Sequence, residues 1–205
     1  MRARDIMTTP VTTVRADTPI KEAAAVLAEN GFTALPVVDD DDRLIGIVTE
    51  ADLVRDRVPR DPRALCHPVH DRLVTTTTTK VGEVMTTAVV AMGPGTDVAV
   101  LAKALLDAGH RSMPIVDGSR VAGIVTRRDI VRVIARDDAT IAAEVRRRLS
   151  IYGGERRWRV EVHDGMVDIG DEFDDETDRH VATVLAEAVP GVVRATAFAA
   201  REVDR

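Results

Sequence analysis

The chain reads Gly-Ile-Val-Thr-Glu-Ala-Asp at residues 46–52 and Gly-Ile-Val-Thr-Arg-Arg-Asp at residues 123–129. A second matching pair lies upstream, Leu-Pro-Val-Val-Asp at residues 35–39 and Met-Pro-Ile-Val-Asp at residues 113–117. The offset is 78 residues for the upstream pair and 77 for the downstream pair, because the first copy has one more residue in its Asp-rich turn. The matches occur in the same order in both copies, and the only change of offset is one residue inside a turn. This pattern indicates that one supersecondary unit is duplicated.

Each repeat reads as strand, helix, strand, strand, helix. Thr18 and Thr96 are suited to cap the start of the first helix, and Gly31 and Gly109 are suited to end it in the left-handed conformation. Apolar residues between these limits follow helical spacing. Two short apolar runs on either side of an Asp-bearing turn then predict a pair of strands. One such unit is too small to be stable alone, so the two repeats are expected to pack against each other.

A third segment begins after Arg136. Apolar residues spaced by four at 141, 145 and 149 predict a helix, and alternation at residues 158–162 followed by Asp164-Gly165 predicts a β-hairpin. A second helix is expected with its buried face at residues 181, 184, 185 and 188, followed by a third strand. The order α-β-β-α-β suits two helices on one face of a small sheet.

Composition excludes several classes of protein. Only 2% of the 205 residues are aromatic and the net charge is −6, so nucleic-acid binding is not expected. The single cysteine, Cys66, rules out an internal disulfide framework. The Cys and His residues at 66–70 have no second cluster to complete a metal site, and no metal is predicted. The sequence shows neither a leader-like N-terminus nor an apolar run long enough for a membrane span, which favours a cytoplasmic protein.

The duplicated motifs resemble those of the CBS (cystathionine-beta-synthase) domain family. Besides the two pairs above, the matching features include the entry Asp/Glu-x-Met-Thr at residues 5–8 and 83–86. The resemblance covers residues 1 to about 136 and implies an α/β (α+β) fold with two β-α-β-β-α modules, 1–57 and 81–136, packed as a pseudo-symmetric pair. Residues 58–80 would form a flexible insertion. The family binds adenosine-containing ligands in the clefts between modules, and its members commonly form dimers, so a homodimer is expected.

The resemblance also implies roles for particular residues. Thr49 and Thr126 would contact phosphate, and Asp52 and Asp129 would accept hydrogen bonds from ribose hydroxyls. Thr and Asp three residues apart at a helix start lie on one face, where free backbone N–H groups suit an anion. The alternative is that each Thr is an N-cap and each Asp only stabilises the first turn. The base would be lined by Ala34, Pro36, Ser112 and Pro114.

The two sites are not expected to be equal. The second motif contains Arg128, and Arg111 precedes the second Pro-bearing strand, whereas the first motif carries Glu50. Arginine forms charge-assisted bonds with phosphate, while glutamate repels it. The cleft that uses Thr126, Arg128 and Asp129 is therefore predicted to bind phosphate more tightly, unless these arginines only form a solvated helix face.

The C-terminal segment resembles the BON domain, named for bacterial osmotic-stress and nodulation proteins. The resemblance rests on residues 160–170 and 189–192 and covers about residues 139–200. That family is proposed to bind phospholipid or to mediate association. Residues 139–205 have a net charge of −4, which disfavours an anionic membrane, although arginines at 146–148 and 156–159 could form a local basic patch.

Taken together, these features predict a non-catalytic sensor without catalytic residues or a required cofactor. It would bind AMP, ADP or ATP, with NAD and S-adenosylmethionine as further candidates, and would relay occupancy through the BON-like domain to an unidentified protein partner. The alternative is a dimeric scaffold or adaptor whose BON-like domain binds phospholipid or a protein without sensing a nucleotide. No Gly-rich phosphate loop, HExxH metal motif or recognisable nucleophile arrangement indicates an enzyme.

Overall fold

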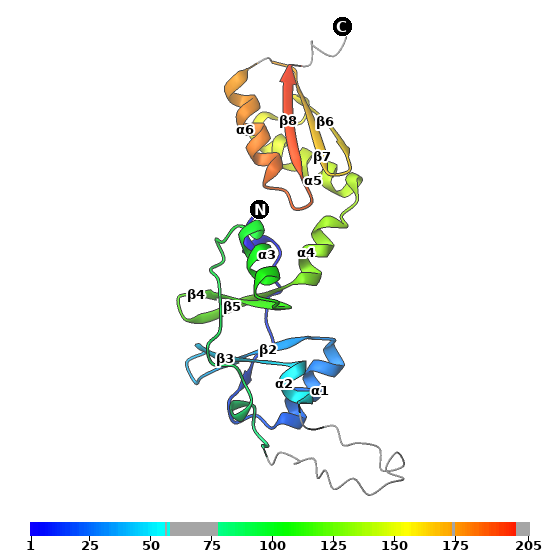
Figure 1. The fold of residues 1–205 in the computed structure, drawn as a ribbon. Helices are drawn as coiled ribbons and strands as arrows, with labels where there is room; N and C mark the ends of the chain where they lie inside the picture. The colour runs from blue at the N-terminus through cyan, green and yellow to red at the C-terminus, as the bar shows by residue number, and fades with distance from the viewer. Residues whose placement is uncertain (56, 58–77, 174, 200–205) are drawn as a thin grey trace, which may run out of the picture. The chain divides into compact units, whose positions relative to one another are not determined.

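The structure is a computed structural model that describes residues 1–55, 57, 78–173 and 175–199 (Figure 1). The chain divides into two compact units. One comprises residues 7–96 and 103–126, and the other comprises residues 1–6, 97–102 and 127–205. The insertion expected at residues 58–80 lies outside the described residues, except for residues 78–80.

The first repeat has the predicted β-α-β-β-α order. It consists of β1 (Val14–Arg15), α1 (Ile20–Asn30), β2 (Ala34–Val38), β3 (Leu44–Thr49) and α2 (Glu50–Val54). β2 is the centre of a three-stranded sheet, parallel to β1 and antiparallel to β3. The predicted apolar face of α1 is buried and packs with the strands in one hydrophobic core.

The second repeat lacks a full first strand. Its elements are α3 (Val98–Asp107), β4 (Ser112–Asp117), β5 (Arg120–Thr126) and α4 (Arg127–Ile134). In place of the first strand, Met92 alone forms a parallel bridge to Ile115, with backbone hydrogen bonds to Pro114 and Val116 of 3.1 and 2.8 Å. The predicted strand is therefore reduced to one bridge residue, in the position that β1 takes beside β2.

The helix ends follow the glycines but not the predicted caps. Gly31 and Gly109 have φ values of 63° and 69°, in the left-handed region where glycine is favoured. The Thr18 hydroxyl instead accepts a hydrogen bond from the Arg15 N–H at 3.0 Å, and α1 begins after Pro19 without a side-chain cap. At α3 the Asp97 carboxylate accepts from the Ala99 N–H at 2.7 Å, so Asp97 rather than the preceding threonine serves the helix start.

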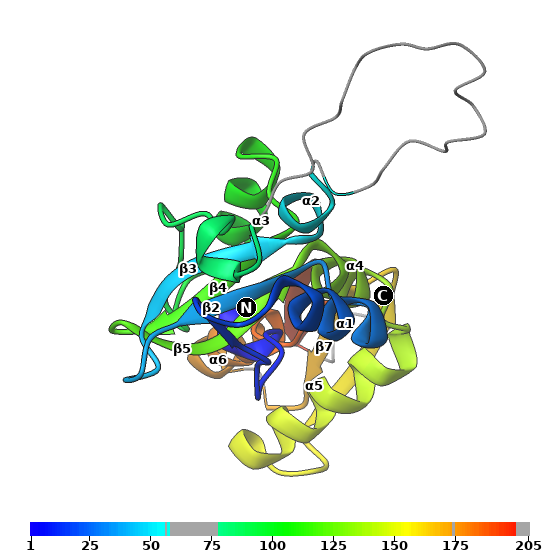
Figure 2. The ribbon, with the colours of Figure 1, turned by 90° about the horizontal axis from the view of Figure 1, so that it is seen from below.

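The two repeats exchange their entry segments. Thr8 forms two backbone hydrogen bonds with Ile124 of β5, and Thr86 forms two with Ile47 of β3. The hairpins also meet near their turns, where the Leu44 N–H donates to the Ser119 carbonyl at 2.9 Å, and they lie side by side in both ribbon views (Figures 1 and 2). The two repeats therefore pack against each other, as the duplicated sequence predicted, but the reciprocal pairing of their entry segments was not predicted.

Glycines make the exchange possible. A Cβ atom on Gly46 would lie 2.5 Å from the Met85 sulfur, and one on Gly123 would lie 2.6 Å from the Met7 sulfur. These separations are far below van der Waals contact. Each repeated methionine therefore fills a space that the repeated glycine of the other copy leaves open.

The C-terminal segment has the predicted α-β-β-α-β order. Its elements are α5 (Asp138–Gly153), β6 (Trp158–His163), β7 (Met166–Asp171), α6 (Glu176–Glu187) and β8 (Arg194–Ala199). β7 is central, antiparallel to β6 and parallel to β8. Asp164 and Gly165 both have positive φ at the hairpin turn, as their sequence predicted. Both helices contribute to one separate hydrophobic core.

The buried face of α6 differs from the prediction. Val184 is 53% exposed, whereas Ala182 and Ala186 are fully buried against the sheet. Alanine has little side chain to project, so it allows the helix to approach the strands closely, and the larger Val184 is left on the outer side. Periodicity alone ranked the larger apolar residue above the smaller one.

A buried ion network stabilises the C-terminal domain. The Arg157 guanidinium donates to both oxygens of Asp171, at 2.9 and 3.1 Å, and also pairs with Asp178. It lies 4.5 Å from the centre of the Trp158 ring. Burial alone would raise the pKa of Asp171, but hydrogen bonds from Arg157 and from two backbone N–H groups outweigh burial and lower it.

Two negative findings apply to the described residues. Of the helices found there, none combines the length and apolar character that crossing a membrane requires. That same part of the chain contains no group of three or more His, Cys, Asp or Glu side chains that could hold a metal ion. Cys66 and the neighbouring histidines lie outside it.

Candidate functional site

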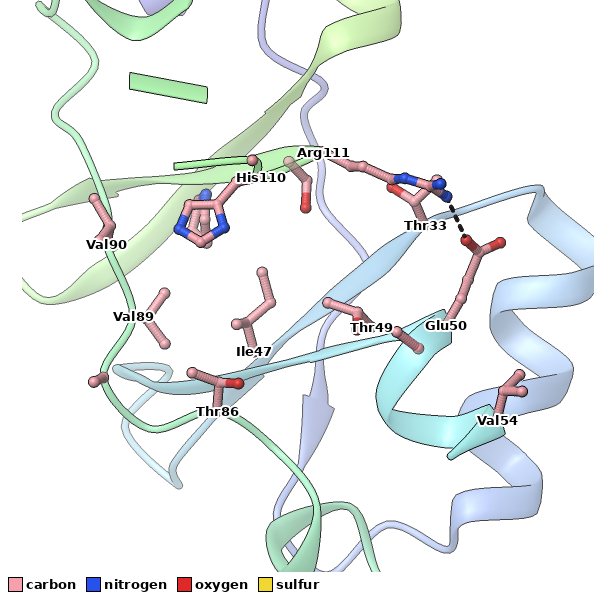
Figure 3. Close-up of a pocket in the computed structure, with 15 residues that line it drawn as sticks. Thr33, Ile47, Thr49, Glu50, Val54, Thr86, Val89, Val90, His110 and Arg111 are labelled. Carbon is pink, nitrogen blue, oxygen red and sulfur yellow. Dashed lines mark hydrogen bonds and ion pairs between the residues drawn. The ribbon is translucent and has the colours of Figure 1, made fainter. Parts of the chain in front are cut away.

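Both repeats line one pocket, which we call the Thr49 pocket (Figure 3). It has a volume of about 550 Å³, within the range of small-molecule sites. The first repeat contributes the residue before β2, part of β3 and the start of α2, and the second contributes its entry segment and the start of β4. The lining residues are Thr33, Ile47, Thr49, Glu50, Ala51, Val54, Thr86, Ala88, Val89, Val90, Gly109, His110, Arg111, Ser112 and Pro114.

Thr49 and Asp52 form a reciprocal cap at the start of α2. The Asp52 carboxylate accepts from the Thr49 N–H at 2.9 Å and from the Thr49 hydroxyl at 2.7 Å, and the Asp52 N–H donates back to that hydroxyl at 3.4 Å. The Glu50 N–H donates to the Thr33 carbonyl at 3.2 Å. With five residues in α2 and these N–H groups engaged, the helix end has less to offer an anion than the sequence suggested.

Arg111 reaches across to the first repeat. Its guanidinium lies 3.4 Å from the Glu50 carboxylate, and Figure 3 shows this pair joining the start of β4 to the start of α2. The sequence analysis treated Arg111 as favourable for phosphate binding at the second motif and Glu50 as unfavourable for it at the first. The structure brings them together on one pocket.

Of the four residues predicted to line the base, two line the pocket and two are buried in a strand. Ser112 and Pro114 line the Thr49 pocket, and Ser112 is only 8% exposed. Ala34 and Pro36 are buried in β2, opposite Thr49 and Ile47 of β3, and are not among the lining residues. Of the ten predicted ligand-binding residues, four therefore line this pocket: Thr49, Arg111, Ser112 and Pro114.

The second motif lies where β5 ends and α4 begins. Thr126 ends β5 opposite Ser112, and Arg128 is exposed on α4. Asp129 is 7% exposed and lies 3.3 Å from Arg132. Thr126 belongs to one compact unit whereas Arg128 and Asp129 belong to the other, so a shared role in a second site remains a prediction.

Thr33 is a pocket residue that the motifs did not reveal. Its hydroxyl oxygen is buried and has no hydrogen-bond partner among the described residues. A buried hydroxyl without a partner costs free energy, so a polar group brought within hydrogen-bond distance of this oxygen would be stabilising. At the repeat offset of 78, Thr33 corresponds to Arg111, which the sequence analysis had singled out, so this correspondence could have identified Thr33.

Four of the arginines that could contribute to a basic patch in the C-terminal segment have partners within that segment. Arg147 and Arg148 pair with Glu144 at 2.8 and 3.1 Å, and Arg146 donates to the Val160 carbonyl at 2.8 Å. Arg157 is held in the buried network, where its side chain is 12% exposed. These four arginines are engaged within their own domain.

The chain spans about a quarter to just over half of the length of the curated relatives that it matches. CBSX1 of Arabidopsis thaliana is 31% identical over 58% of this chain and 57% of that protein. An uncharacterized protein of Methanocaldococcus jannaschii is 28% identical over 90% of this chain but only 39% of its own length. Some relatives are named as enzymes, such as L-aspartate semialdehyde sulfurtransferase of Methanosarcina acetivorans, of which the match covers 24%.

Solved structures of CBS domain pairs are similar in fold to the part of this chain that contains both repeats. One pair, in complex with 5′-methylthioadenosine and S-adenosyl-L-methionine, is 28% identical, with a TM-score of 0.53 over 65% of this chain and 94% of that one. CBSX2 of Arabidopsis thaliana, in complex with AMP, is 30% identical, with a TM-score of 0.52 over 64% of this chain and 93% of that one. The CBS domain model matches residues 3–58 and 81–136. Because these matches span both repeats and more than half of the sequence, the chain belongs to the CBS domain family.

Proposed function

We propose that this chain is a non-catalytic regulatory protein that binds an adenosine-containing ligand in the Thr49 pocket. The observation that carries the proposal is a pocket lined by residues of both repeats, one of which, Thr33, has a buried hydroxyl without a partner among the described residues. Solved pairs of this family hold AMP, 5′-methylthioadenosine and S-adenosyl-L-methionine. CBS pairs are generally regulatory and non-catalytic. The likeness makes AMP and S-adenosylmethionine candidate ligands, and we add ADP, ATP and NAD as related adenosine compounds.

The pocket offers suitable chemistry for such a ligand. Apolar side chains from β3 and the second entry segment, among them Ile47 and Val89, can pack against a purine, while hydroxyls of Thr49 and Ser112 can pair with polar ligand atoms. The Asp52 carboxylate accepts hydrogen bonds from the Thr49 N–H and hydroxyl. For it to accept from ribose hydroxyls as well, these hydrogen bonds must either be shared with the ligand or be broken.

The Thr33→Val variant provides the sharpest test. It removes the unpaired hydroxyl while keeping the size of the side chain, so the free protein should be at least as stable as the wild type. Ligand affinity should fall by about tenfold, the worth of about one hydrogen bond. A thermal-shift titration with the five ligands measures both, since a ligand at 100 times its Kd adds about 2.7 kcal/mol. The exposed Thr12→Val is the matched control.

Two outcomes would overturn the proposal. If none of the five compounds stabilises the wild-type protein at millimolar concentration, the pair is a scaffold rather than a sensor. If a ligand stabilises the wild type, Thr33→Val and Thr12→Val equally, the ligand binds elsewhere, and the Thr126 motif becomes the next site to test by Asp129→Ala.

The C-terminal domain enters the proposal as the element that reports ligand occupancy. We infer a BON-like domain over residues 139–200, following modules at 1–57 and 81–136, on the α-β-β-α-β order and the separate core. A protein partner is favoured over phospholipid because Arg146, Arg147, Arg148 and Arg157 are engaged internally. Flotation with anionic vesicles tests this choice, and binding that is lost on replacing Arg146, Arg147 and Arg148 by alanine would favour the lipid-binding adaptor instead.

Self-association is also proposed. α4 exposes Val131 and Ile134, at 60% and 77%, one turn apart on the same helix. Two apolar side chains exposed together on a helix suit an interface between copies. A homodimer and a cytoplasmic location complete the proposal.

A further inference from the structure

The Thr49 pocket has a balanced set of charges. Among the fifteen residues that line it, those with ionisable side chains are Glu50, His110 and Arg111. The Glu50 carboxylate and the Arg111 guanidinium carry opposite charges that cancel each other. A nucleotide with several phosphates therefore meets one guanidinium and one carboxylate, and no second arginine or lysine among the lining residues.

The guanidinium is also already engaged. Arg111 lies 3.4 Å from Glu50, and in Figure 3 its side chain extends past Thr33 toward that carboxylate. The two side chains are 73% and 49% exposed, so they stand at the open side of the pocket, where a 5′ substituent could approach them. A phosphate that takes Arg111 leaves the Glu50 carboxylate without this partner and close to the new negative charge.

We propose that the Glu50–Arg111 pair selects adenosine compounds by charge, so that affinity falls as phosphates are added and Glu50 is a specificity-determining residue. This inference rests on the proposed function and deepens it. The favoured class comprises nucleosides and nucleoside monophosphates, whose substituent carries few negative charges. Di- and triphosphates are disfavoured because like charges a few ångströms apart repel even in water.

The position of Glu50 within the repeat supports a role particular to this pocket. The corresponding residue of the second repeat, at the offset of 77, is Arg127, so the duplicated motif accepts opposite charges at this point. Glu50 is exposed and its side chain is not part of the Thr49–Asp52 cap, so its replacement removes a charge without removing a buried contact.

The experiment is a titration of the full chain with 5′-methylthioadenosine, AMP, ADP and ATP in magnesium-free buffer of low ionic strength. The signal is the NMR resonance of the His110 ring, identified with a His110→Gln variant, because His110 lines this pocket and reports binding there. In the wild type, Kd should increase from AMP to ATP. In Glu50→Gln, the ratio of the ATP and AMP values should shrink by about tenfold. Glu29→Gln, an exposed charge on α1, should leave the ratio unchanged.

Raising the salt concentration should narrow the wild-type ratio as well, because screening weakens interactions between exposed charges. The inference is overturned if ATP binds the wild type as tightly as AMP, or if Glu50→Gln and Glu29→Gln give the same ratio as the wild type. If none of the four compounds shifts the His110 resonance, the proposed function itself fails in this pocket and the inference fails with it.

Discussion

Replacing Gly46 by alanine tests whether the repeats depend on their reciprocal contact. The new Cβ atom would lie 2.5 Å from the Met85 sulfur and 3.2 Å from the Thr86 carbonyl oxygen. Carbon and sulfur normally stay at least about 3.5 Å apart, so the overlap is about 1 Å. The Met85 side chain can bend, but Thr86 is held by two backbone hydrogen bonds to Ile47 of 2.9 Å each. The substitution must therefore either displace the methionine or strain this bridge.

We expect Gly46→Ala to lower the free energy of unfolding by about 1–3 kcal/mol, the usual cost of an overpacked site. For a chain of this length, each kcal/mol corresponds to about 2–4 °C in Tm. Thermal unfolding followed by far-UV circular dichroism measures the change. The only tryptophan, Trp158, lies in the other compact unit, so its fluorescence reports whether the C-terminal domain is unaffected.

Two matched variants separate steric overlap from the general effect of replacing glycine. Gly93→Ala places a Cβ no closer than 4.0 Å to its nearest neighbour, so this control should be neutral or slightly stabilising. Combining Gly46→Ala with Met85→Ala removes the atom that is struck, so the double variant should cost at least about 1 kcal/mol less than the two single changes added together. Equal Tm values for Gly46→Ala and Gly93→Ala, or strict additivity in the double variant, would refute the reasoning.

Three further predictions concern charge and assembly. Asp171→Asn should lower the free energy of unfolding of the C-terminal domain by about 3–5 kcal/mol, because it leaves the buried Arg157 without its main partner. Asp168→Asn, at an exposed position, is the control and should change that free energy by less than about 0.5 kcal/mol. Urea unfolding followed by Trp158 fluorescence measures both. Hydrogen bonds and charge from Arg147, and to a smaller extent from Arg148, lower the pKa of Glu144 from its ordinary value of 4.5 to about 2. The resulting stabilisation is present above the unfolded pKa and is lost as pH falls from about 4.5 toward 2, so the stability gap between wild type and Glu144→Gln should close over that range and stay constant near pH 7. Light scattering should give twice the monomer mass for the wild type and a lower mass for a variant with serine at both Val131 and Ile134; a monomeric wild type would contradict the homodimer.

Much of the fold could be read from the sequence because its signals are local or repeated. The α1 stripe, the left-handed glycines and the Asp164-Gly165 turn depend on neighbours a few residues away, and the structure confirms each of them. The errors arose where the local pattern allowed more than one partner or more than one buried face. Thr18 bonds to a turn instead of capping α1, and α6 packs through its alanines because small side chains permit a closer approach to the sheet.

The site was less accessible to sequence reasoning. The motifs identified Thr49, Ser112 and Pro114, which line the pocket, but they grouped residues by repeat. The exchange of entry segments means that a wall of the pocket comes from residues 86–90, which lie far along the chain from Thr49. The sequence also contrasted Glu50 with the arginines of the second repeat, without revealing that Arg111 pairs with it.

The duplication, the order of the elements and the residue types of the two motifs follow from the amino-acid sequence alone, because periodicity and turn chemistry act over short distances along the chain. Which copies of the motifs meet depends on the three-dimensional packing of the two repeats. The contacts of Gly46 with Met85 and of Glu50 with Arg111 join residues that are 39 and 61 positions apart. Such contacts depend on how the two repeats cross, and the pattern of either repeat alone does not contain that information.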